Sequence, residues 1–152
     1  MSFDEITLVN QIAAQERSIA GVKASFNYAA NPDMLAANLL PAVVHFIPSF
    51  SAEPRGHFNL WKNELTLQSV CFVAPREAQG GKLRYLENEA IPYGAKWRAK
   101  FQDSSVINTL LTQVSGVKVF LIGGTYGAGG VLLTYAGIEY IGFVFTFSAT
   151  SA

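Results

Sequence analysis

Residues 123–130, GGTYGAGG, have the glycine content of a loop that binds phosphate. Such a loop cradles phosphate with backbone N–H groups, and a Gly-Lys-Ser/Thr ending adds a lysine for the phosphates and a hydroxyl for magnesium. This segment lacks that ending, and the residues that follow it, VLLTY, have the composition of a strand and not of a helix. The sequence therefore predicts a flexible loop between two strands, with no nucleotide or other cofactor.

The two histidines and the single cysteine are the next residues whose side chains could do chemistry. His45 lies in an apolar run and His57 in a polar segment, and neither has a Cys or His partner at a metal-ligand spacing. Cys71 alternates with apolar neighbours, which predicts a buried thiol and not a nucleophile. One cysteine cannot form an intrachain disulfide, which is typical of a reducing compartment. We expect no metal site.

The rest of the sequence also lacks residues at the spacing of known catalytic motifs. The sequence holds no Gly-x-Ser-x-Gly elbow for a nucleophilic serine. Glu87 and Glu89 lie two positions apart, and side chains with that spacing face different ways on a helix. We find no set of catalytic residues and expect the protein not to be an enzyme.

The charge of the chain argues against a dedicated nucleic-acid binder. Eleven basic and eleven acidic residues give a formal net charge of zero, whereas binding to phosphates needs clustered Lys and Arg. Basic residues gather only in one part of the chain, at Lys82, Arg84, Lys96, Arg98 and Lys100. A solvated helix face accounts for that group.

The composition predicts one domain, residues 1–152, with more apolar surface than a single subunit is expected to bury. Half of the residues are hydrophobic and 14% are charged, against roughly 25% in an average soluble chain. No apolar run approaches the roughly 20 residues of a membrane-spanning helix, and the start, MSFDE, lacks the pattern of a secretory signal. We therefore expect no membrane partner and extensive contacts between subunits.

Helical periodicity is concentrated in two parts of the chain. Residues 3–20 begin with a Ser2–Glu5 capping box and end before Gly21. Residues 82–113 are expected to form two helical pieces, the first carrying Trp97 and Phe101 and the second Val106, Ile107, Leu110 and Leu111. A short helical turn is expected over residues 31–38.

Strand patterns fill much of the remaining sequence. They cover residues 22–28, a run from residue 42 closed by Pro48, and residues 60–75, 117–122, 131–135 and 138–149, with a loop or a hairpin arm over 49–59. In the last strand one face consists of Ile141, Phe143, Phe145 and Phe147, and we expect it to lie under the helices. The fold class is α+β, a mostly antiparallel β-sheet packed by an N-terminal helix and a central helical section. The sheet is expected to be apolar on both faces.

This layout resembles the tail terminator or tail completion proteins of tailed bacteriophages. The similarity rests on IAGV (residues 19–22) between the first helix and a strand, LPAVV (residues 40–44) before the second strand, the aromatic central helices, and YAGIEYIG (residues 135–142) before the last strand. The pieces are short and span most of the chain. The resemblance agrees with the α+β fold expected from the patterns.

The resemblance implies a structural virion protein without an active site. Such a protein forms a ring, generally of six copies, on the last ring of the tail tube at the head-proximal end of the tail. There it stops tube growth and offers a surface to the head-completion or connector protein. Double-stranded DNA only passes through the lumen, without sequence-specific binding. The chain would be found in the virion, and in the host cytoplasm during assembly.

Two segments are candidates for the contact with the next subunit or with the tube. Both are polar or glycine-rich and are expected to be loops at the edges of the sheet, where binding residues concentrate. The candidate residues are Glu53, Pro54, Arg55, Gly56 and His57 in the first segment, and Thr125, Tyr126, Gly127 and Gly129 in the second.

Two other interpretations remain. One is a different neck or baseplate component of the phage with the same fold. The other, from another class, is a small ligand-binding or catalytic α+β domain with an apolar pocket lined by Tyr93, Trp97 and Tyr140.

Overall fold

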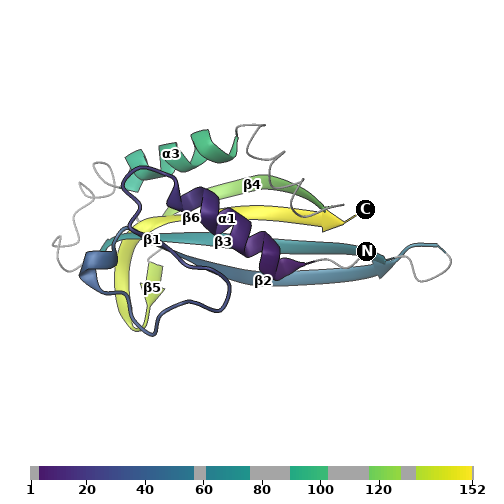
Figure 1. Cartoon of the computed structure of the whole chain (residues 1–152), viewed down its shortest axis with the longest axis horizontal. Coiled ribbons are helices and arrows are strands. Elements are labelled where there is room, and N and C mark those ends of the chain that lie inside the picture. Colours follow the sequence, from purple (N-terminus) through teal and green to yellow (C-terminus); the bar gives the residue numbers. More distant parts are fainter. Residues whose placement is uncertain (1–3, 57–60, 76–89, 103–116, 128–132, 152) are drawn as a thin grey trace.

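A computed structural model describes residues 4–56, 61–75, 90–102, 117–127 and 133–151 of the chain. In these residues a six-stranded, mostly antiparallel sheet carries helices on one face, which confirms the α+β class (Figure 1). The elements in chain order are α1 (Glu5–Arg17), β1 (Ala24–Ser25), η1 (Ala37–Leu39), β2 (Ala42–Pro54), β3 (Trp61–Pro75), α3 (Ile91–Phe101), β4 (Val117–Gly127), β5 (Leu133–Tyr135) and β6 (Ile138–Ser151).

The strands lie in the order β1-β2-β3-β6-β4, and β5 pairs with the start of β6. Only the β1–β2 pair is parallel. The two long outer strands, β2 and β4, therefore lie at opposite sides of the central pair β3–β6. This separation decides which residues a single chain can bring together.

Helix α1 begins two residues later than the expected Ser2–Glu5 capping box predicts. Asp4 is the N-cap: its Oδ1 accepts a hydrogen bond of 3.0 Å from the backbone N–H of Thr7. A carboxylate at this position also interacts favourably with the helix dipole, which explains why Asp4 takes the role expected of Ser2. The helix ends at Arg17, and Gly21 adopts the left-handed conformation (φ +94°) that turns the chain back to the sheet.

The main core lies between the helices and the sheet. Trp97 of α3 meets Phe143 of β6 edge-to-face with ring centroids 5.1 Å apart, and Phe101 meets Phe147 in the same way at 5.0 Å. Leu8, Val9 and Ile12 fill the part of this core under α1. Phe143, Phe145 and Phe147 are all buried, so the predicted facing of the last strand is confirmed.

The opposite face of the sheet is apolar at one end only. There a second cluster is formed by Leu35, Leu40, Ala42, Val44, Val70, Phe72, Leu133 and Tyr140. Toward the other end the same face presents half-buried polar side chains, namely Thr66, Gln68, Thr146 and Ser148. The expectation of a sheet apolar on both faces is therefore wrong for that end.

Several boundaries differ from the expected ones. Strand β1 has two residues where 22–28 was expected, and the turn expected over 31–38 is reduced to η1. Strand β2 does not stop at Pro48: the pairing with β3 shifts register between Phe46 and Ser49 and then continues to Pro54. A bulge lets a strand pass a proline, which has no N–H to donate.

Both segments expected to be loops are largely strand. Residues 49–54 belong to β2, so the hairpin arm is confirmed and the loop alternative is wrong. Residues 123–127 belong to β4, so the expected flexible glycine loop is wrong over those positions. The second central helical piece, with Val106, Ile107, Leu110 and Leu111, lies outside the described residues.

Candidate functional site

The first part of the candidate site is the far end of the β2–β3 hairpin, which we call the arm (residues 49–54 and 61–64). Figure 1 shows β2 and β3 continuing beyond the start of α1, so the helix layer does not cover the arm. Every arm residue of β2 is exposed, whereas residues 42–45 of the same strand are buried. Neither of the described helices therefore lies on the arm.

The two faces of the arm differ in chemistry. Residues directly opposite in a strand pair lie on the same face. Phe50 is opposite Leu65, which faces the helices, and Pro54 is opposite Trp61, so the aromatic side chains share the helix side. Phe50 is 52% exposed and Trp61 is 51% exposed. The other face is polar, with Ser49, Ser51, Glu53, Lys62 and Glu64.

The second part of the candidate site is β4 at the other edge of the sheet. It pairs with β6 on one side, and no described residue pairs with its outer side. A cavity of about 340 Å³ lies between β4 and the end of α3. It is lined by Arg98 and Gln102 of α3, by residues 121–126 of β4, and by Phe143 and Phe145 of β6.

One glycine shapes this cavity. Gly124 lies opposite Phe145 in the strand pair, and a Cβ at Gly124 would overlap the Phe145 ring. The ring therefore extends over the edge strand and forms part of the cavity floor. Nearby, the register of β4 shifts between Leu121 and Gly123, and Ile122 is left exposed. The glycine serves close packing in a strand, and not the loop flexibility that the sequence suggested.

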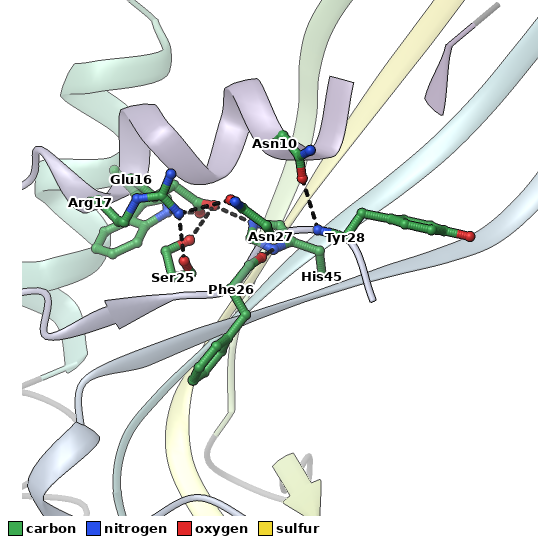
Figure 2. Close-up of polar contacts among 9 residues, drawn as sticks. Asn10, Glu16, Arg17, Ser25, Phe26, Asn27, Tyr28 and His45 are labelled. Atoms are coloured by element: carbon green, nitrogen blue, oxygen red, sulfur yellow. Dashed lines mark hydrogen bonds and ion pairs between the residues drawn. The ribbon is translucent and has the colours of Figure 1, made fainter. Parts of the chain in front are cut away.

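A buried polar cluster holds the helices to the sheet beside these two surfaces. Glu16 of α1 is fully buried and accepts hydrogen bonds from Trp97 Nε1 (2.6 Å) and Ser25 Oγ (3.4 Å), and it pairs with Nε2 of His45. Nδ1 of His45 lies 2.8 Å from the carbonyl oxygen of Phe26, as Figure 2 shows. A carbonyl only accepts, so Nδ1 carries a proton. With one proton shared between Oε1 of Glu16 and Nε2 of His45, every one of these contacts has a donor and an acceptor.

This cluster positions elements and does not resemble a catalytic site. Both nitrogens of His45 are occupied, and the Glu16 carboxylate is enclosed. Burial raises the pKa of the Cys71 thiol well above its ordinary value, and the negative charge of Glu16 raises this pKa further. Cys71 is buried as the sequence predicted, and a thiol with a raised pKa is a poor nucleophile. Outside the cluster, Arg17 ties α1 to the next segment through the carbonyl of Ser25 at 2.8 Å and Oδ1 of Asn27 at 2.9 Å (Figure 2).

The predicted contact residues fall into two separate groups. Glu53 and Pro54 end β2, and Arg55 and Gly56 follow in the hairpin connection. Thr125, Tyr126 and Gly127 lie on β4. His57 and Gly129 lie outside the described residues. Strands β3 and β6 separate the groups, so one chain does not join them into one site.

The residues that give the two surfaces their character carry little local signal. The alternation of Phe50, Ala52 and Pro54 with polar residues indicates one apolar face of the arm, but the expected contact residues include neither Phe50 nor Trp61. The solvated helix face expected for Arg98 does not indicate its position beside β4, which depends on packing. The Gly124–Phe145 contact depends on strand register, which no local pattern indicates.

The alternative apolar pocket does not form from the three aromatics proposed for it. Trp97 belongs to the core on the helix side of the sheet, and Tyr140 belongs to the cluster on the opposite side. Both are buried. Tyr93 is partly buried and packs against the same core cluster as Trp97. The sheet lies between Trp97 and Tyr140, so they cannot line one pocket.

Among the described residues, no group of three or more His, Cys, Asp and Glu side chains is placed to hold a metal ion. In the same part of the chain, neither helix has the length and apolar character needed to span a membrane. Comparison with protein-family models and with curated proteins finds no match to this chain. Support for a function therefore comes from the chain's own surfaces and from its layout.

Proposed function

We propose that this chain is a structural virion protein that forms a ring of six copies and terminates the tail tube of a tailed bacteriophage. The observation that carries the assembly part of this proposal is the pair of unlike surfaces at opposite edges of one sheet. The arm exposes Phe50 and Trp61 at one edge, and β4 has an open edge with a cavity at the other. Unlike surfaces that bind each other repeat head to tail, and such contacts generate a ring when the rotation closes.

The free energy gained by burying apolar side chains favours assembly through these two surfaces. An arm with two half-exposed aromatic side chains buries little within its own subunit, whereas burying an apolar side chain stabilises by roughly 1.5–3 kcal/mol. The low charge of the chain, 14% of residues, is typical of a protein that buries additional apolar area between subunits. The two surfaces support an oligomer. The resemblance in layout to tail terminator proteins supports the assignment of that oligomer to a phage tail.

Net neutrality supports a role as a conduit. A lumen through which double-stranded DNA passes must not hold phosphates, and the chain has eleven basic and eleven acidic residues. The proposed partners are further copies of this chain, the tail tube protein below, and a head-completion or connector protein above. The proposed location is the head-proximal end of the tail, after assembly in the host cytoplasm.

Imaging of particles that carry a tag on this chain tests the proposal. We expect a closed ring at the head-proximal end of the tail, and tails of uncontrolled length when the chain is removed. A ring at the neck or baseplate with normal tail length would favour a different structural component of the virion. A chain that stays monomeric even with the tube protein present would overturn the proposal, whereas a monomer in isolation would not, because assembly can need the tube as a template.

A further inference from the structure

Only part of β2 is open at its outer edge. Near its start, β2 pairs with β1, and Phe26 contacts it through a backbone hydrogen bond to Val43 and through His45. Beyond Phe46, no described residue pairs with the outer edge of β2. Pro48 and Pro54 lack an N–H, so the stretch between them, residues 49–53, is the part that can donate hydrogen bonds to another strand.

The directions of the strands suit head-to-tail addition. Strands β2, β3, β6 and β4 are antiparallel in turn, so β2 and β4 run in opposite directions at the two edges. When a second copy is placed beside the first in the same orientation, its β2 runs antiparallel to β4 of the first. This pairing continues the alternation of the sheet, and adding a strand to an open edge is a common mode of recognition.

We propose that residues 49–53 of one copy pair with the outer edge of β4 of the next copy, and that Phe50 enters the cavity under α3. This inference rests on the proposed ring and names the contact that builds it. Phe50 lies on the helix side of β2, and the cavity lies on the helix side of β4. With Phe50 opposite Gly124, the Phe50 ring would lie against the Phe145 ring, which extends over Gly124 and forms part of the cavity floor. Ser49 is then opposite Thr125.

A cation borders the proposed contact. Arg98 of α3 lines the cavity, whereas Lys96 and Lys100 hydrogen-bond to the carbonyl oxygen of Ala20 and to Oγ of Ser18, beside the end of α1. Residues 49–53 carry Glu53 as their only charged side chain, and it lies opposite Lys62 on the face away from the helices. The proposed contact therefore depends on strand pairing and on the apolar Phe50 ring more than on charge.

A cysteine pair tests the register. Ser49 and Thr125 are exposed and lie on the same face of the sheet, opposite to the helices. They are on opposite edges of one chain, so a disulfide between them must join two copies. In rings isolated from the purified Ser49→Cys/Thr125→Cys protein or from particles that carry it, we expect oxidation to give a ladder of linked copies up to six. The native Cys71 is buried and does not interfere.

The matched control is Ser49→Cys/Thr134→Cys, in which the second cysteine lies on β5 and is equally exposed. We expect no ladder from it. Rings that form without a ladder from the Ser49/Thr125 pair would overturn this inference and leave the proposed function standing. Linked dimers only, or dimers from Thr125→Cys alone, would show that two β4 edges meet, which also overturns it. Absence of rings both from purified protein and from particles overturns the proposed function together with the inference.

A second pair of variants tests Phe50. Phe50→Ala is expected to raise the protein concentration needed for half-maximal ring formation by about tenfold or more, because an aromatic anchor in a pocket dominates binding. Phe46 is similarly exposed on the other face of the same strand, and Phe46→Ala is expected to change this concentration less than about twofold. Equal effects of the two substitutions would show that Phe50 does not enter the cavity.

Discussion

Trp97 Nε1 donates a hydrogen bond of 2.6 Å to Glu16 Oε2, and this bond joins α3 to α1 across 81 positions of the chain. The other oxygen of Glu16 contacts Ser25 and His45, so one carboxylate ties both helices to the β1–β2 edge. The helices in turn cover β6 and border the cavity beside β4. The shape of that cavity therefore depends on a carboxyl group buried in the core.

Replacing Glu16 with Ala is expected to lower the free energy of unfolding by about 3–5 kcal/mol. The substitution leaves a buried His45, Ser25 and the Trp97 N–H without their partner, and removing one partner of a buried hydrogen-bonded pair is costly for this reason. Denaturant unfolding measures the effect. Glu64→Gln, on the exposed arm, serves as the control and should change stability by less than about 0.5 kcal/mol. A similar small loss for Glu16→Ala would contradict the role assigned to the cluster.

Replacing Phe145 with Ala is expected to cost about 3–5 kcal/mol, as for other core aromatics. Phe145 is 5% exposed and packs against Phe143 and Gly124. The exposed Phe46→Ala should cost less than about 1 kcal/mol in the same denaturation experiment. A loss below about 1 kcal/mol for Phe145→Ala would show that its ring is not part of the core.

Gly124 and Phe145 are expected to be coupled. Gly124→Ala alone should destabilise by about 1–3 kcal/mol, because the new methyl group overlaps the Phe145 ring. In a Phe145→Ala background the same change should cost much less, since the ring is gone. A double-mutant cycle by denaturation measures this coupling. Strict additivity of the two changes would contradict the contact.

These tests also separate what the sequence could predict from what it could not. The burial of Phe143, Phe145 and Phe147 follows from alternation alone, because one face of a strand repeats every second residue. The bulge after Phe46 and the Gly124–Phe145 contact follow from register between strands distant in sequence. The bond from Trp97 to Glu16 likewise depends on how α1 and α3 are packed together, and neither residue is unusual in its local sequence.

The free energy of unfolding is expected to fall as the pH rises above the ordinary pKa of a cysteine thiol, in part because of Cys71. Burial raises the pKa of this thiol in the folded protein, so the folded state keeps its proton at a pH where the unfolded chain has lost it. The unfolded state then binds fewer protons, and the free energy of unfolding decreases with pH until the folded thiol also ionises. Cys71→Ala should reduce this slope by up to about 1.4 kcal/mol per pH unit. Equal slopes with and without the thiol, measured between pH 9 and pH 10, would contradict the assignment.

Deleting residues 54–57 is expected to leave a folded protein that no longer caps tails. Residues 54–56 are exposed, and none of them belongs to the two core clusters. The deletion also removes the Pro54–Trp61 pair that ends the β2–β3 ladder next to residues 49–53. The edge proposed to pair with β4 of the next copy then loses its support, so ring contacts should fail while the thermal midpoint stays nearly unchanged. Thr134→Ala, an exposed change on β5 that leaves the arm intact, is the control and should cap tails normally. Electron micrographs of phage carrying the deletion decide the matter. We expect tubes of uncontrolled length or tails without heads, and tails of normal length joined to filled heads would exclude the arm as an assembly contact.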